Sequence, residues 1–491
     1  MFSAFDNFPA LLIWLPLIGA IICFVLKNEG TVKAWSVFSS ILSLGVVGAS
    51  LVYSGPEYIN LNQVSYVWLK TIGSSFTLVL DGMSKLLCLL TALAFPIIFI
   101  ATYNRSYPGF NSFYGLMLLS QCGLMGVFMA MDALVFYFFW ELALIPVYFL
   151  ASLWGGEKRV QATFKFFIYT FAGSLLMLVG IIYLYLKSPD QSFSLVAFYN
   201  TGASLPNSDQ YWLFWLFFVA FAIKMPVFPF HTWQPDVYEQ STSAVTMVMS
   251  GVMVKMGVFA VIRWLLPTFP SAAMYFDNVV IGLSVVGMIY ASCIAIVQDD
   301  LKRLVAYSSI AHVGLMCAAA FAVNHAGIQG VMVQMFNHGI NIIGLWIVVD
   351  LVEKKLGTRK ISKLGGLAHH APSLTILLVV IALANIALPL TNAFIGELLM
   401  FSGLYQFNAW YTAFAGLSII LAAVYMLNMI KNVFYGNYNT LTETITEIEN
   451  HEKIILAVIV VLIFMVGFFP GPVLNLTNDI SNSIIQRTLA K

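Results

Sequence analysis

Residues 211–230 read YWLFWLFFVAFAIKMPVFPF, an apolar run that ends in one lysine, Lys224, and is then interrupted by Pro226 and Pro229. Proline lacks a backbone donor and disfavours a helical conformation in the residue before it, so a helix ends near this point. Freed backbone groups are tolerated at membrane depth only where protein or a wet cavity satisfies them. The stretch therefore predicts a broken helix inside a membrane, with a buried amine at the break.

The composition of the whole chain agrees with a membrane location. Of the 491 residues 60% are hydrophobic and 9% are charged, and the formal net charge is +1 at pH 7. Such a chain has too little polar surface to cover a water-soluble globule. Because a helix needs about 20 apolar residues to cross the hydrocarbon, we predict an all-α integral membrane protein with about fourteen transmembrane helices. Their predicted starts are near Ala10, Thr31, Met83, Ser112, Asp132, Ala162, Tyr211, Ser243, Asn278, Lys302, Gly327, Pro372, Trp410 and Lys453.

Lys and Arg are distributed unevenly over the predicted loops. Of 23 such residues, fifteen fall in the loops after odd-numbered spans and five in the termini and the loops after even-numbered spans. The other three, Lys85, Lys224 and Lys255, fall within or at the edge of spans. By the positive-inside rule, both termini lie on the outer side. The first span has no basic segment before it and predicts a retained helix and not a signal peptide.

The connecting segments predict no soluble domain. The longest are about residues 53–80, 187–210 and 353–371, which are too short to fold alone. The first two are interpreted as caps on the outer face. The third contains the basic sequence KKLGTRKISKLGG, which is interpreted as an orientation signal or as a docking surface for an acidic partner or lipid.

No redox cofactor is predicted in this chain. The five cysteines are scattered without a Cys-x-x-Cys spacing, which argues against iron–sulfur ligation and disulfides. There is also no strand-flanked GxGxxG and no Walker motif. His312, His325 and His338 recur at 13-residue intervals, a spacing compatible with a haem between helices. The remaining histidines fall at predicted helix ends or in loops, so we do not favour haem.

Four ionisable residues lie inside apolar runs: Glu141, Lys224, Lys255 and Glu397. A charged side chain at the bilayer centre costs roughly 3 kcal/mol on insertion scales, so each needs a partner or water. Burial disfavours the charged form of both Glu and Lys, and a nearby opposite charge restores it, which suits groups that exchange protons. The alternative is a structural Glu–Lys pair that joins helices. The uneven arrangement, with two lysines in successive spans and carboxylates far away in sequence, favours a proton path.

Histidines and one acidic pair extend the candidate set. His312 and His338, in the tenth and eleventh spans, are interpreted either as proton relays or as hydrogen-bonding groups between helices. Relay is favoured because imidazole titrates near neutrality. His231, in the turn after the break, is interpreted as structural or as the mouth of the path. Asp350 and Glu353 are interpreted as a solvated cluster at a helix end.

Five motifs together carry a resemblance to a known family. They are DGMS (81–84), KMPVFPFHTWQPDVY (224–238), VKMGVFAVIR (254–263), QDDLKRLVAYSSIAHVG (298–314) and FNHG (336–339). In these motifs the chain resembles the antiporter-like, proton-pumping subunits of NADH–quinone oxidoreductase, respiratory complex I, which are related to subunits of multi-chain Na⁺/H⁺ antiporters. The resemblance covers about residues 10–475.

The resemblance implies an internal organisation. Two inverted five-helix repeats, spans 4–8 and 9–13, would each hold a half-channel and one broken helix, at spans 7 and 12. The corresponding segments are residues 1–110, an N-terminal three-helix region; 111–268 and 269–436, the two repeats; and 437–491, a C-terminal helix and tail. One departure from the family is Gln240-Ser241-Thr242 after the first break, where relatives commonly have Ala-Pro.

The resemblance also implies roles for the buried residues. Glu141 and Lys224 would be the coupling pair of the first half-channel, and Lys255 the central proton carrier. His312 and His338 would be relays, and Glu397 the exit-side group. Glu397 stands where the L-type and N-type chains usually have Lys, so the chain resembles the M-type members, called chain 4 in mitochondria.

As a member of that family the chain would be an enzyme subunit without a redox centre of its own. NAD, FMN, iron–sulfur clusters and quinone would be bound by partner subunits. Its direct partners would be the L-type and N-type chains and the lipid bilayer, not nucleic acid, in a bacterial inner membrane with both termini periplasmic. Two alternatives remain: a subunit of a cation/proton antiporter complex, which Glu397 argues against, and a structural spacer, which the intact polar series argues against.

Overall fold

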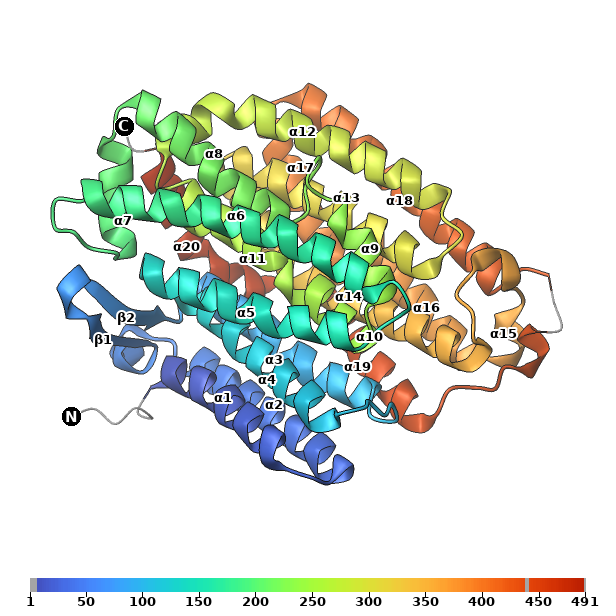
Figure 1. The fold of residues 1–491 in the computed structure, drawn as a ribbon. Helices are drawn as coiled ribbons and strands as arrows, with labels where there is room; N and C mark the ends of the chain where they lie inside the picture. Colours follow the sequence, from blue (N-terminus) through green and yellow to red (C-terminus); the bar gives the residue numbers. More distant parts are fainter. Residues whose placement is uncertain (1–6, 438–440, 490–491) are drawn as a thin grey trace. The chain divides into compact units, whose positions relative to one another are not determined.

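The computed structural model describes residues 7–437 and 441–489. These residues form two compact units (Figure 1). Unit 1 comprises residues 1–225, 252–276 and 476–491, and unit 2 comprises residues 226–251 and 277–475.

Unit 1 is built mainly from long helices. They are α1 (Phe8–Val25), α2 (Glu29–Val52), α3 (Gly82–Ala101), α4 (Phe110–Met129), α5 (Ala133–Leu153), α6 (Arg159–Lys187), α7 (Leu195–Ser204), α8 (Asn207–Lys224) and α11 (Lys255–Ala260). Side chains that accept a backbone N–H begin several of them: Asn7 for α1, Asp81 for α3 and Asp132 for α5. Such caps satisfy backbone donors that a helix start leaves free.

A small β-hairpin departs from the all-α prediction. Strands β1 (Gln63–Leu69) and β2 (Ser74–Val79) pair antiparallel within the segment predicted only as a cap (Figure 1). Short bridges join Leu78 to Ala130 and Asp132 to Ser194. The loops after the second, fourth and sixth spans therefore meet, as they must if successive helices run in opposite directions. These strands were hard to predict from sequence, because short strands at the periphery of a protein do not need a clear alternating pattern.

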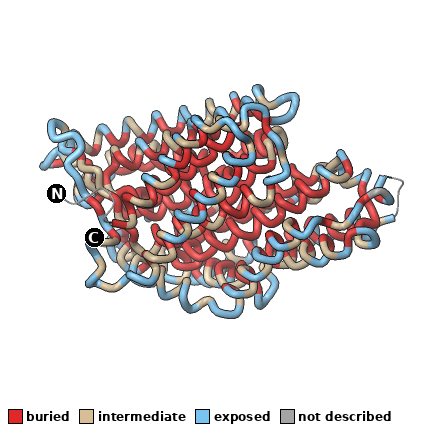
Figure 2. Tube along the Cα trace, turned by 90° about the horizontal axis from the view of Figure 1, so that it is seen from below, coloured by how far each residue is buried: buried red, intermediate tan, exposed pale blue. Residues whose placement is uncertain are grey.

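Unit 2 contains the second set of helices. They are α9 (Trp233–Gln240), α10 (Ser243–Val248), α13 (Leu301–Phe321), α14 (His325–Leu356), α15 (Leu367–His370), α16 (Pro372–Asn385), α17 (Asn392–Phe407), α18 (Ala409–Val433) and α19 (Asn450–Phe468). Two further helices, α12 (Pro270–Ile296) and α20 (Gly471–Leu489), have residues in both units. Every residue of α14 from Gly327 to Val352 is buried. Figure 2 colours buried residues along the chain red and exposed residues pale blue.

An ion-pair network in unit 2 joins α9, the start of α13 and the end of α14 to the connecting segments that contain Asp300 and Arg359. Arg359 binds Asp300, Glu353 and Glu239, while Arg303 binds Glu239 with Nη1 3.0 Å from Oε2. The Lys302 ammonium lies 3.1 Å from Glu353 Oε2. The interpretation of Asp350 and Glu353 as a solvated cluster is therefore wrong: Glu353 is paired with two cations, and Asp350 is buried. Part of the basic connector thus has an internal role, which neither sequence interpretation included.

Twelve helical segments in the described residues are long and apolar enough to cross a membrane. They correspond to the predicted spans except the seventh and the twelfth. Those two are the spans predicted to be broken: α8 ends at Lys224 and α9 begins at Trp233, while α16 ends at Asn385 and α17 begins at Asn392. The predicted number of fourteen spans is reached if α8 with α9, and α16 with α17, each count as one interrupted crossing in addition to these twelve. The two inverted repeats and the four-part division stay predictions.

The two breaks have different local causes. At the first, Met225 caps the C-terminus of α8 and precedes Pro226, which cannot donate a backbone hydrogen bond. At the second, Ala387 and Leu390 adopt positive φ angles of 55° and 74°, a left-handed conformation that side chains with a Cβ rarely adopt. Backbone strain of this kind persists only where the surroundings fix it and is concentrated at functional sites.

Candidate functional site

Glu141 and Lys224 lie in unit 1, on α5 and at the last residue of α8. Lys224 is 1% exposed, and its ammonium has no hydrogen-bond partner among the described residues. The nitrogen lies 5.4 Å from the centre of the Trp140 ring, whose face attracts a cation. Glu141 is half-buried, is close enough to act electrostatically on Lys224, and has one buried carboxylate oxygen without a hydrogen bond in the described part of the chain. The ammonium therefore depends on Glu141 and Trp140 for its stabilisation.

Lys255 is the first residue of α11 and is fully buried. A π-helical segment, Met249–Met253, precedes α11, and a second, Val261–Leu265, follows it. Single π-helical turns inside α-helices occur often at functional sites, because the wider turn redirects side chains. Sequence reasoning found the lysine but not the π-helical flanks, since no residue pattern marks them.

Two glycines allow the helices that carry this set to pack closely. A Cβ on Gly257 of α11 would lie 2.6 Å from the Phe221 carbonyl oxygen and 2.7 Å from the Met225 nitrogen, both at the end of α8. A Cβ on Gly123 of α4 would lie 2.5 Å from the Ala143 nitrogen of α5. These contacts are closer than any side chain permits. Only glycine therefore allows α11 to approach the end of α8, and α4 to approach α5, this closely. These helices carry Lys255, Lys224 and Glu141.

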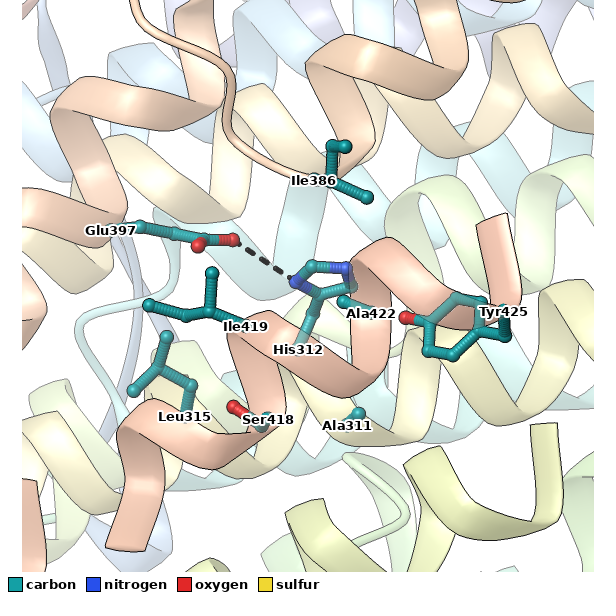
Figure 3. Close-up of a pocket in the computed structure, with 9 residues that line it drawn as sticks. All are labelled: Ala311, His312, Leu315, Ile386, Glu397, Ser418, Ile419, Ala422 and Tyr425. Atoms are coloured by element: carbon teal, nitrogen blue, oxygen red, sulfur yellow. Dashed lines mark ion pairs between the residues drawn. The ribbon is translucent and has the colours of Figure 1, made fainter. Parts of the chain in front are cut away.

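In unit 2 the structure brings Glu397 and His312 together. Glu397 Oε1, on α17, lies 3.1 Å from His312 Nδ1, on α13, and both side chains are 8% exposed. Figure 3 shows the carboxylate and the imidazole pointing toward one another. Gln334 of α14 adds a second contact from Nε2 to Glu397 Oε1 at 3.4 Å. The carboxylate thus contacts polar groups of two other helices, α13 and α14.

Amides continue this polar cluster around the second helix break. Asn337 Nδ2 donates to the Asn392 carbonyl oxygen at 2.7 Å, and Asn392 Nδ2 donates to Asn341 Oδ1 at 3.0 Å. Asn341 Nδ2 donates to the Ala384 carbonyl oxygen at 3.3 Å, near the end of α16. Interrupted helices leave backbone groups to be satisfied, and the asparagines supply some of those partners. Sequence reasoning missed them, because Asn is common in loops and only the fold brings the residues of these three helices, α14, α16 and α17, together.

A small cavity lies beside the Glu397–His312 pair (Figure 3). Its volume is about 20 Å³, which is enough for one water molecule. Polar groups that line it include Ser418 and Tyr425 of α18 in addition to the pair itself. Tyr425 also makes a hydrogen bond of its own, because its hydroxyl donates to Ser308 Oγ at 3.0 Å.

The remaining predicted residues are buried near these groups or at the break. The ring of His338, on α14, lies 5.4 Å from that of His312, centre to centre. His231 is buried in the turn after Lys224, where its ring packs against Phe228 and Tyr290. The structure thus groups Glu141, Lys224 and Lys255 in unit 1, and His312, His338 and Glu397 in unit 2.

More than half of the chain matches one known protein family. A profile of the family described as NADH:quinone oxidoreductase/Mrp antiporter, transmembrane, matches residues 130–423. The chain belongs to this family. It is accordingly a multi-pass integral membrane protein, and all six candidate residues lie within the matched range.

Relatives and solved structures extend the match to nearly the full length. NADH-quinone oxidoreductase subunit M of Rickettsia prowazekii is 35% identical, over 96% of this chain and 98% of that protein. F(420)H(2) dehydrogenase subunit M of Methanosarcina mazei is 32% identical, over 97% and 98%. A chain of respiratory complex I from Thermus thermophilus with bound NADH superposes with a TM-score of 0.90 at 27% identity, over 97% and 99%. A chain of the Mrp complex from Dietzia sp. DQ12-45-1b shares the fold, with a TM-score of 0.86 at 18% identity.

Proposed function

We propose that the chain moves protons across the membrane as the M-type, antiporter-like subunit of NADH–quinone oxidoreductase. The observation that carries this proposal is the contact between Glu397 and His312, an acid and a titratable ring buried together beside a broken helix in a chain of this family. Its partners are other membrane-arm subunits of the complex. NAD, FMN, iron–sulfur clusters and quinone are bound by partner subunits, in a complex of the bacterial inner membrane.

The proposed path begins at the coupling pair. While Glu141 is near, its charge stabilises the Lys224 ammonium, whose one further partner among the described residues is the Trp140 face. When a change in field or hydration draws Glu141 away, the charged form of Lys224 loses this support and passes a proton towards Lys255. Moving one elementary charge against 100 mV costs about 2.3 kcal/mol. An ion pair at 4 Å is worth about 4 kcal/mol at an effective dielectric of 20, so rearranging one pair supplies enough free energy.

The second part of the path lies in unit 2. His312 and His338 relay the proton, and Glu397 accepts it through the Nδ1 contact and releases it to water on the outer side. Glu397 suits this role because its carboxylate contacts the titratable ring of His312 and lines the water-sized cavity. Both termini lie on the periplasmic side in this orientation.

The test is to purify the native assembly under mild conditions and identify its subunits, then to measure proton uptake by inverted vesicles. We expect co-purification with the other subunits of an NADH–quinone oxidoreductase and NADH-driven uptake that Lys255→Ala abolishes. A cation/proton antiporter would instead give Na⁺-dependent proton movement without NADH oxidation. That result, or an assembly without redox subunits, would overturn the proposal.

A further inference from the structure

Asn385 occupies the last position of α16, where the twelfth predicted span breaks, and is 2% exposed. Its amide nitrogen donates to Ser308 Oγ at 3.1 Å and lies 3.4 Å from His312 Nε2. An amide nitrogen carries two hydrogens, so it can donate to both neighbours at once. Ser308 Oγ accepts a second hydrogen bond, from Tyr425 OH. The side of the amide that faces His312 is therefore a donor.

This arrangement determines where the neutral imidazole carries its hydrogen. A ring nitrogen that accepts a hydrogen bond carries no hydrogen, so Nε2 opposite the amide is bare. A neutral imidazole has one N–H, which must then be on Nδ1. Nδ1 is the atom that lies 3.1 Å from Glu397 Oε1. The hydrogen is thus already directed at the proposed proton acceptor.

We propose that Asn385 is a positioning residue that selects the Nδ1–H tautomer of His312 and so sets the direction in which a proton crosses the ring. This inference rests on the relay role of His312 in the proposed function. One proton arrives at Nε2 and one leaves Nδ1 for Glu397, so the ring ends neutral and Glu397 ends as the carboxylic acid. When Nε2 carries a hydrogen, the Asn385 amide must turn so that Oδ1 faces the ring as an acceptor. The orientation of the amide therefore controls whether a proton can be transferred to Nε2.

The alternative role for Asn385 is to join α16 to α13 through Ser308 alone. The two roles differ in their effect on the ring. The titratable groups that face His312 are Glu397 on α17, His338 on α14 and, through Ser308, Tyr425 on α18, while α16 contributes only the amide. A substitution at Asn385 therefore changes the hydrogen bonding of Nε2 without removing a titratable group.

The first test reads the tautomer directly, without proton pumping. The full-length chain, which has seven histidines, is labelled with ¹⁵N-histidine in lipid bilayers, and the His312 signals are those absent from His312→Gln. We expect wild type to show a protonated Nδ1 and a bare Nε2, and Asn385→Leu to show a mixture of tautomers. A wild-type ring protonated at Nε2, or an unchanged tautomer in Asn385→Leu, would overturn the proposal. The wild-type spectrum alone can overturn the proposal, even if Asn385→Leu does not fold.

The second test measures turnover against pH in the assembled complex. The carboxylate of Asn385→Asp can only accept, so it holds His312 as the imidazolium. We expect at least a tenfold loss of turnover and a pH optimum about one unit more alkaline, since a nearby opposite charge shifts titration by one unit or more. Asn385→Leu should lose turnover without the alkaline shift. The control is Asn62→Leu, because Asn62 is buried and donates twice to backbone carbonyls outside the path; it should match wild type per assembled complex.

The outcomes separate the inference from the proposed function. If His312→Gln is impaired but Asn385→Asp keeps the wild-type pH profile, Asn385 only joins helices and the relay stands. If His312→Gln pumps like wild type, the relay itself fails, and with it the basis of the inference.

Discussion

Lys224 and Glu397 are both buried, but in opposite kinds of surroundings. The Lys224 ammonium has an aromatic face and the field of Glu141, with no hydrogen-bond acceptor among the described residues. Glu397 is held by His312 and Gln334. A buried charge without hydrogen bonds is costly, whereas a carboxylate that accepts two is supported. We infer that Lys224 is the end of the path that releases a proton readily, and Glu397 the end that receives one.

The coupling pair gives the first prediction. Glu141→Gln removes the charge that stabilises Lys224, and Lys224→Ala removes the amine itself. We expect both variants to assemble but to lose about tenfold or more in turnover and in proton pumping together, since proton transfer by one positioned group contributes roughly 10²–10⁴-fold. The loss extends to electron transfer because a blocked path stalls a tightly coupled complex. The measurement is NADH oxidation and proton uptake in vesicles, and normal pumping by assembled Glu141→Gln would contradict it.

Glu397 gives a graded series. Glu397→Asp keeps the acid but shortens it by one methylene, which lengthens the contact to His312 Nδ1. Glu397→Gln keeps the shape but cannot titrate, and Glu397→Lys introduces the residue usual in the L-type and N-type relatives. We expect activity to fall from wild type to Asp to Gln, with Lys above Gln because an amine also carries a proton. The measurement is NADH-driven proton uptake per assembled complex. If the Glu397→Gln variant pumps as well as wild type, Glu397 is a packing residue.

At the scale of the element, the two broken helices illustrate what sequence reasoning can reach. Pro226 and Pro389 stand inside apolar runs, and proline has one local effect on any helix, so both breaks were predictable. The left-handed backbone at Leu390 was not predictable, because no residue pattern marks it. Nor was its close packing against α19, where a Cβ on Gly467 would lie 2.1 Å from the Leu390 carbonyl oxygen. The partners of Glu397 were likewise only partly predictable, since hydropathy marks a histidine in a span but not which helix faces it.

Close helix packing gives the third prediction. Gly257→Ala places a methyl group against the backbone at the end of α8, where neither Phe221 nor Met225 can yield as a flexible side chain would. We expect a loss of about 1–3 kcal/mol in stability, seen as a lower melting temperature, together with reduced pumping as α11 moves away from α8. The matched control is Gly282→Ala, because no atom lies within 4 Å of the Cβ that it adds. Equal melting temperatures for the two variants would show that the Gly257 contact is not required.

At the scale of the whole molecule, the candidate residues divide between the two units. The lysines and Glu141 belong to unit 1, and the histidines and Glu397 to unit 2. Loop contacts within each unit fit helices that alternate in direction: β2 and residues 130–132 meet in unit 1, and Asp300 meets Lys360 in unit 2. Alternation fixes which loops share a side, and the distribution of Lys and Arg then assigns that side.

The last prediction tests this orientation. The loop between α5 and α6 carries Lys158, on the side predicted to be cytoplasmic, and the loop between α6 and α7 carries Asp190, on the opposite side. If α6 crosses the membrane once, these two loops face opposite compartments. Single-cysteine variants at Lys158 and Asp190 therefore serve as controls for each other. Cys293, the one exposed native cysteine among those described, is first replaced by Ser.

A membrane-impermeant maleimide should label Lys158→Cys in inverted vesicles and Asp190→Cys in right-side-out vesicles, by at least tenfold in each case. The rule rests on the excess of basic residues in short loops, where each cation resists translocation. Labelling of both positions from the same side would show that α6 does not cross the membrane. The opposite pattern would place the termini in the cytoplasm. The side to which Glu397 is proposed to release protons would then be cytoplasmic, which would reverse the direction of the proposed path.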